Sequence, residues 1–154
     1  MRLDFKVATR EKVIEETQAD YFLSTVLLVD DSRVDNFINV KAINTNQFSK
    51  EVHVFKRSKL ALNFLNEIIE AKDIENFPEV IFLDLNMPSM NGPEFLEHFE
   101  RLPKEYIQNV RVVILSNFIS EEVSHKLGKK HPRIVRFIEK PLINSNLMEL
   151  RDNM

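Results

Sequence analysis

The sequence predicts an α/β protein with a doubly wound, five-stranded parallel sheet, and three observations lead to this prediction. Short β-branched and aliphatic runs alternate along the chain with segments of helical periodicity, as in repeated right-handed strand–helix–strand units. Most of these runs are apolar throughout, which is typical of parallel strands buried on both faces. Four of them end in polar residues, and the carboxyl ends of parallel strands are where such sheets place their ligands.

Five segments are expected to form the strands. Four are apolar runs, whereas the second alternates apolar and polar residues, as an edge strand does. In chain order the segments are 25–29, 51–55, 80–83, 110–115 and 135–139.

Helical periodicity fills the gaps between the strands. Ser32 is a good N-cap for a first helix. One face of this helix carries Val34, Phe37 and Ile38. Ser58 can cap the second helix, which has the clearest apolar stripe of the chain: Ala61, Phe64, Leu65, Ile68 and Ile69.

The remaining helices are marked by residues typical of helix ends. Pro93, after Gly92, indicates the start of a third helix, with an apolar stripe of Phe95, Leu96, Phe99 and Leu102. Ser120, which is followed by two acids, predicts the start of a fourth helix, and Gly128 predicts its end. A last, short helix is expected over 145–151.

The chain is expected to divide into an extension over 1–22 and one domain over 23–154. The extension is polar and charged from 9 to 20, which is compatible with a short exposed helix capped by Thr9. No chemistry is evident in it. Only thirteen residues follow Pro141, so we expect a stand-alone domain without an attached output domain.

Composition excludes several classes of protein. The chain of 154 residues has 44% hydrophobic and 29% charged residues, which is ordinary for one globular domain. It has no cysteine, no signal-peptide pattern and no apolar run of about 18 residues, so we expect a cytoplasmic protein without a membrane partner. Two glycines are too few for a glycine-rich phosphate loop. A net charge of −3 argues weakly against a nucleic-acid partner.

Three carboxylates, a hydroxyl and an ammonium follow the predicted strands. Asp30 and Asp31 follow the first strand, Asp84 the third, Ser116 the fourth and Lys140 the fifth. Two carboxylates about 4 Å apart repel by roughly 4 kcal/mol at an effective dielectric constant near 20, and a bound cation removes this repulsion. Mg²⁺ suits such a site, and an aspartate carboxylate can act as a nucleophile toward a phosphoryl donor.

Four motifs in this order resemble the signature of a known family. They are Asp30-Asp31, the segment 84–92 (Asp-Leu-Asn-Met-Pro-Ser-Met-Asn-Gly), Leu115-Ser116 and Glu139-Lys140-Pro141. Together they resemble receiver domains of two-component response regulators over about 24–154. The resemblance implies the flavodoxin-like receiver fold, with strand order 2-1-3-4-5. The first helix, with Asp-Asn-Phe-Ile-Asn over 35–39, is similar to that of single-domain receivers.

The resemblance assigns a metal site and a phosphoacceptor. Asp84 would accept the phosphoryl group. Mg²⁺ would be held by Asp31 and Asp84 directly, by Asp30 mostly through water, and by the backbone carbonyl of Asn86. Lys140 would contact the phosphoryl oxygens, and the family implies a cis peptide bond before Pro141.

The resemblance also assigns two switch residues. Ser116 would donate a hydrogen bond to a phosphoryl oxygen once Asp84 is modified. Phe137 stands at the position of the switch aromatic but has no hydroxyl; the alternative is that it is one more core aromatic. Asn117 and Phe118 are bulky neighbours of Ser116, so we expect slow self-dephosphorylation.

These assignments predict a single-domain response regulator. It would accept a phosphoryl group on Asp84 from a histidine kinase or a phosphotransfer protein and would switch protein–protein interactions, without catalysing another reaction. One alternative is a receiver-like interaction module that does not depend on phosphorylation. Another is a phosphohydrolase of the haloacid dehalogenase type, which is disfavoured because its two acids stand two residues apart, whereas Asp30 and Asp31 are adjacent.

Two further groups of residues are expected to lie at the surface. The four histidines show no metal-ligand spacing, and we expect surface or edge positions for all of them. A basic run is interpreted as a solvated loop or, alternatively, a partner-docking patch; it consists of Lys126, Lys129, Lys130, His131, Arg133 and Arg136.

Overall fold

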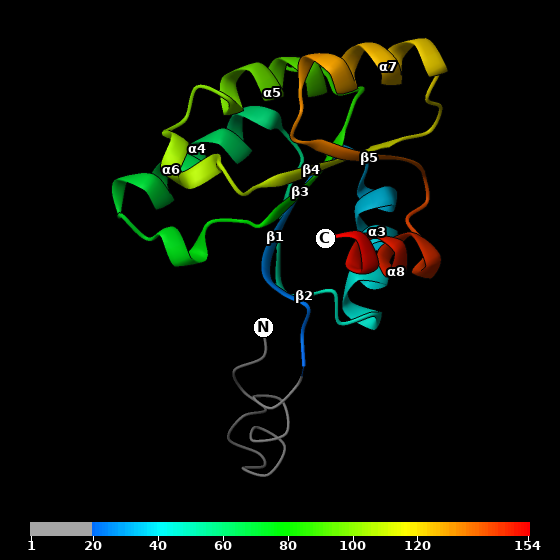
Figure 1. Ribbon diagram of the computed structural model, residues 1–154, viewed down its shortest axis with the longest axis horizontal. Helices are drawn as coiled ribbons and strands as arrows, with labels where there is room; N and C mark the ends of the chain where they lie inside the picture. Colours follow the sequence, from blue (N-terminus) through cyan, green and yellow to red (C-terminus); the bar gives the residue numbers. More distant parts are fainter. Residues whose placement is uncertain (1–19) are drawn as a thin grey trace.

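A five-stranded parallel sheet organises the protein, as a computed structural model that describes residues 20–154 shows (Figure 1). The strand order is β2-β1-β3-β4-β5, which confirms the predicted fold class and order. Each strand begins and ends within two residues of its predicted bounds: β1 Leu23–Val29, β2 Ser49–Phe55, β3 Val80–Asp84, β4 Arg111–Ser116 and β5 Ile134–Glu139. The helix expected over 9–20 lies outside the described residues, except that Asp20 is not helical.

Helices cover both faces of the sheet (Figure 1). One face carries α3 (Arg33–Thr45) and α8 (Asn144–Asn153), and the other carries α4 (Ser58–Glu70), α5 (Gly92–Phe99) and α7 (Glu121–Lys130). The sequence did not predict two short helices, η1 (Ile74–Asn76) and α6 (Lys104–Ile107). No helix within 20–154 is long and apolar enough to cross a bilayer.

The sheet divides the core into two apolar clusters. Successive side chains of a strand point to opposite faces, so Leu27 and Val29 of β1 join the cluster under α4 and α5. Val26 and Leu28 join the cluster under α3 and α8. All five residues of β3 are buried, which explains why this strand is an uninterrupted apolar run up to Asp84.

The first turns of α3 bury polar residues and leave the predicted apolar stripe exposed, whereas Ile43 further along the helix is buried in the core. Val34, Phe37 and Ile38 share one face but are 67%, 71% and 39% exposed. The buried side chains of α3 include Asn36 and Asn39. Their amides bond to backbone groups at strand ends: Asn36 Nδ2 donates to the Asp30 carbonyl oxygen at 2.8 Å, and Asn39 Oδ1 accepts from the Leu142 N–H at 3.2 Å.

This orientation leads to a prediction for the exposed aromatic residue of α3. Replacing Phe37 by serine is expected to change the free energy of unfolding by less than about 0.5 kcal/mol, because a substitution at an exposed position removes little packing. Urea unfolding followed by circular dichroism would measure the change. A loss of about 3 kcal/mol or more, typical of a buried phenylalanine, would contradict the exposed placement.

Three predicted helix ends were wrong. The third helix does not reach Leu102, because α5 ends at Phe99. Arg57, not Ser58, is the N-cap of α4, and the Ser58 hydroxyl instead donates to the Met90 carbonyl oxygen at 3.0 Å. Gly128 does not end α7, which continues to Lys130. A helix-ending glycine requires a left-handed conformation, and Gly128 does not have a positive φ.

The predicted surface placement was wrong for His131, and the loop predicted for the basic run was also wrong. His131 is 1% exposed, and its Nδ1 lies 3.0 Å from Glu100 Oε2 of the segment after α5. Lys126, Lys129 and Lys130 lie in α7 and Arg136 lies in β5, and only His131 and Arg133 lie in the connection between the two elements. Several of its members bond to neighbouring elements: Lys130 to Glu97, Arg133 to the Ile107 carbonyl oxygen and Arg136 to Glu149.

Candidate functional site

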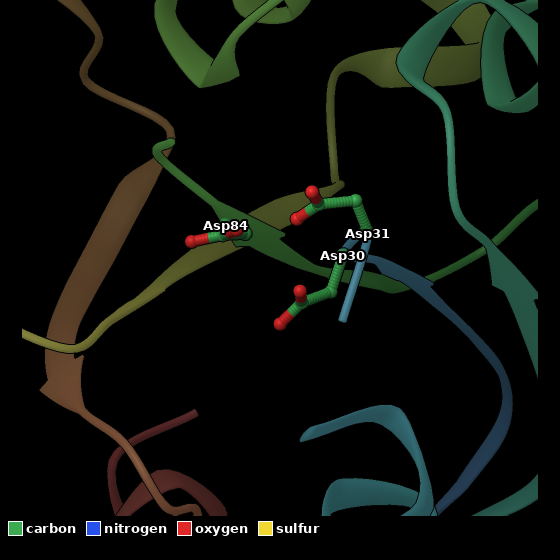
Figure 2. A group of neighbouring side chains, drawn as sticks. All are labelled: Asp30, Asp31 and Asp84. Atoms are coloured by element: carbon green, nitrogen blue, oxygen red, sulfur yellow. The ribbon is translucent and has the colours of Figure 1, made fainter. Parts of the chain in front are cut away.

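Three carboxylates meet at the carboxyl edge of the sheet, as predicted. The strands β1 and β3 are neighbours, and Val29 pairs with Leu83, so the residues that follow, Asp30 and Asp84, come to the same point. Figure 2 shows the side chains of Asp30, Asp31 and Asp84 around a common space. Each offers one oxygen atom, and these atoms all lie within 4.8 Å of one another. A group of carboxylates that close together fits a hard divalent cation such as Mg²⁺.

Lys140 brings a buried ammonium group to this cluster from the end of β5. Its side chain is 5% exposed, and its Nζ lies 2.6 Å from Asp30 Oδ2, 2.9 Å from Asp35 Oδ2 and 3.6 Å from Asp84 Oδ1. The peptide bond between Lys140 and Pro141 is cis, as the resemblance implied. The sequence prediction missed Asp35, which reaches the site from the first turn of α3.

The charges and burial at the site shift two pKa values. Burial, with the neighbouring charge of Asp30, raises the pKa of Asp84 from 3.8 to about 6, although Lys140 and the N–H of Asn86 oppose the shift. Burial lowers the pKa of Lys140, but hydrogen bonds to Asp30 and Asp35 outweigh it, and the net pKa is raised. Lys140 is therefore charged at neutral pH, whereas Asp84 takes up a proton in mildly acidic solution.

Ser116 ends β4 and is fully buried. Its hydroxyl donates to the Phe118 carbonyl oxygen at 3.2 Å, and its own carbonyl oxygen accepts from the Lys140 N–H at 2.8 Å. The end of β4 is thereby joined to the residue that carries the ammonium group. Asn117 is exposed, and Phe118 is 74% exposed. The expected slow self-dephosphorylation stays a prediction.

The other two predicted site residues, Asn86 and Phe137, are not members of the carboxylate cluster. Asn86 is exposed, and its N–H points at Asp84 Oδ1 at 3.4 Å; metal ligation by its carbonyl stays a prediction. Phe137 lies on β5, partly buried against the core cluster under α4 and α5. It also lines a surface hollow with side chains of α7, among them Glu121 and His125.

The doubly wound sheet, with acidic residues and a lysine at its carboxyl edge, has the architecture of a flavodoxin-like receiver. A family model described as response regulator receiver domain matches residues 26–151. The chain belongs to this family and is a receiver domain of two-component signalling. Receiver domains accept phosphoryl groups from histidine kinases or phosphotransfer proteins, and the family consists mainly of signalling switches.

Individual relatives agree with this assignment. The chain is 28% identical over 97 residues to the response regulator Rcp1 of Synechocystis sp., covering 63% of this chain and 64% of Rcp1. It is 34% identical over 119 residues to a protein-glutamate methylesterase/protein-glutamine glutaminase of Treponema denticola, covering 75% of this chain and 28% of that protein. The chain thus spans less than two thirds of the length of these curated relatives.

Solved structures give the same fold. A two component response regulator from Cytophaga hutchinsonii superposes with a TM-score of 0.74 at 26% identity, covering 85% of this chain and 98% of that one. A response regulator receiver protein from Dyadobacter fermentans gives a TM-score of 0.71 at 27% identity, covering 85% and 96% of the two chains.

Proposed function

We propose that this protein is a single-domain response regulator that accepts a phosphoryl group on Asp84 in an Mg²⁺-dependent reaction. The donor would be a histidine kinase or a histidine phosphotransfer protein, and the modified protein would change its protein partners in the cytoplasm. One observation supports the proposal most directly. Oxygen atoms of Asp30, Asp31 and Asp84 lie within 4.8 Å of one another, and the buried Lys140 ammonium faces them.

The chemistry proposed for Asp84 is nucleophilic displacement. A carboxylate oxygen of Asp84 attacks the phosphorus atom, and the bond to the donor's leaving atom breaks. The ionised form is needed, and Lys140 favours it. When bound, Mg²⁺ would be held by Asp30, Asp31, Asp84 and the Asn86 carbonyl, and it would neutralise negative charge on the site and on the phosphoryl oxygens.

The proposed switch begins at Ser116. A phosphoryl group adds roughly two negative charges and three strong acceptors, and the Ser116 hydroxyl would leave the Phe118 carbonyl to donate to one of them. The segment after β4 would then move toward Asp84, and Phe137 would turn into the space that is vacated. The phosphoryl group would act by favouring one of two conformations, which differ in the surface formed by α7 and β5.

The test is incubation of the purified chain with Mg²⁺ and a small acyl phosphate, followed by intact-mass measurement. One phosphoryl adduct is expected, and chelation of Mg²⁺ is expected to prevent it, because the acidic cluster would then repel the anionic donor. Failure to form an adduct with Mg²⁺ and donor in excess would reject the proposal.

The second candidate is an interaction module that does not depend on phosphorylation. The alternative would gain support if the protein bound the same partners with equal affinity before and after treatment with the donor. Burial of the site argues against this second candidate. Asp84 and Lys140 are only 7% and 5% exposed, and burying charged groups is costly without a role that compensates for the cost.

A further inference from the structure

The Lys140 ammonium group lies on the α3 side of the site. Its two shortest contacts are with Asp30 at 2.6 Å and Asp35 at 2.9 Å, whereas Asp84 is 3.6 Å away. The first two distances are those of charge-assisted hydrogen bonds, and the third is longer than such a bond. Asp35 is not part of the carboxylate cluster formed by Asp30, Asp31 and Asp84.

The position of Asp35 is fixed by the bonds of α3. Ser32 is the N-cap of α3, and its hydroxyl accepts a hydrogen bond from the Asp35 N–H at 3.1 Å. Asn36, the next residue, joins α3 to the end of β1, and Asn39, one turn further, joins it to Leu142, two residues after Lys140. The helix that carries the Asp35 carboxylate is therefore hydrogen-bonded to the chain after β1 and to the chain after β5.

We propose that Asp35 is a positioning residue that holds the Lys140 ammonium away from Asp84 and thereby restrains phosphorylation. A cation in the cluster would neutralise Asp30 and Asp84 but not Asp35. Asp35 would then be the strongest anionic competitor of the incoming phosphoryl oxygens for Lys140. The effect on phosphorylation rests on the proposed function, whereas the position of Lys140 does not.

The test compares wild-type protein with Asp35→Asn, which keeps the shape of the side chain and removes its charge. At saturating Mg²⁺, the initial rate of adduct formation with an acyl phosphate is expected to rise about threefold, which is the size of effect that a partly exposed ion pair supplies. A merely structural role would slow the reaction and not accelerate it. Asp152→Asn removes a charge from an exposed position of α8 and is expected to keep the wild-type rate.

A double-mutant cycle separates the proposed restraint from simple repulsion of the donor. In a Lys140→Gln background, Asp35→Asn is expected to have no effect on the rate, because the ammonium group it would release is gone. Acceleration that persists in this background would overturn the proposal, since it would then arise from the charge of Asp35 acting on the donor. An unchanged or lower rate in the single variant would also overturn it.

A second measurement does not require phosphorylation. Asp35→Asn is expected to weaken Mg²⁺ binding about threefold in calorimetry, because the released ammonium moves toward Asp30 and Asp84 and competes with the cation. This effect should also vanish in the Lys140→Gln background. If wild-type protein formed no adduct, the proposed function would fail, and the Mg²⁺ titration alone would decide whether Asp35 restrains Lys140: an unchanged affinity would reject the restraint.

Discussion

Replacement of Asp84 by asparagine is expected to abolish the phosphoryl adduct and, at the same time, to stabilise the Mg²⁺-free protein by about 2 kcal/mol near pH 7.5. The first effect follows from loss of the nucleophilic carboxylate. The second follows from the pKa of Asp84, which is raised from 3.8 to about 6, largely by burial. Keeping this carboxylate ionised at neutral pH therefore costs free energy of folding, and the neutral amide avoids that cost.

The pH dependence of this difference has a definite sign. A carboxyl group with a raised pKa binds its proton more tightly in the folded state, so it supports stability fully below pH 3.8. That contribution is lost as the pH rises through about 6. The wild type and Asp84→Asn should therefore have similar free energies of unfolding in acid. As the pH rises, the variant should become the more stable of the two.

Urea unfolding in the presence of a chelator, followed by circular dichroism at several pH values, would measure the stability difference. Asp152→Asn is the matched control, because Asp152 is exposed and its replacement should leave the stability unchanged. Equal stability of wild type and Asp84→Asn near neutral pH would show that the ionised Asp84 carboxylate does not destabilise the folded protein. An adduct that persists in the variant would move the phosphoacceptor to another residue.

Gly92→Ala is expected to destabilise the protein by about 1–3 kcal/mol, as overpacking typically does. A Cβ atom on Gly92 would lie 2.8 Å from the Asp84 carbonyl oxygen and 2.9 Å from Leu85 Cα. Both are backbone atoms that cannot rotate away. Gly92 also donates its N–H to the Leu85 carbonyl oxygen at 3.0 Å, so α5 starts in direct contact with the backbone of the proposed phosphoacceptor.

Gly128→Ala is the control, and its effect should have the opposite sign. A Cβ atom there would meet only the Phe137 ring, at 3.8 Å, which is ordinary van der Waals contact. Because Gly128 lies inside α7, alanine should stabilise the helix by roughly 0.5–1 kcal/mol. Thermal or urea unfolding of both variants would test the pair. Stabilisation by Gly92→Ala would contradict the close approach seen at the end of β3.

The strands and the acidic cluster could be predicted because their signals are local. An apolar run such as that of β3 is long enough to identify a strand, and Asp84 stands directly after it. Parallel topology then brings the strand ends together, so the meeting of Asp30, Asp84 and Lys140 follows from the order of elements.

The orientation of α3 could not be predicted in the same way. Its apolar stripe predicts a buried face only if apolar burial decides the orientation. Here Asn36 and Asn39 satisfy backbone groups at the edge of the sheet, and Asn39 reaches Leu142, which is 103 positions away in the chain. The polar residues at 35, 36 and 39 were a usable signal, because three polar groups at this spacing share one side of a helix.

Two further errors have the same physical origin. Ser58 had the composition of a cap, but its hydroxyl found a tertiary acceptor on Met90. His131 resembled a surface histidine, but its ring is buried and pairs with Glu100, 31 positions earlier in the chain. In both cases a partner distant in sequence replaced the local or solvent interaction that composition favours.

The amides of Asn36 and Asn39 end on main-chain atoms of Asp30 and Leu142. Every amino acid supplies that carbonyl at position 30, and every one except proline supplies that N–H at position 142. These two bonds are therefore independent of the identity of the acid at position 30, although the Asp30 carboxylate adds a third bond of its own, from the Ser32 N–H at 2.9 Å. A related chain with another residue at position 30 would therefore keep both amide bonds between α3 and the carboxyl edge of the sheet.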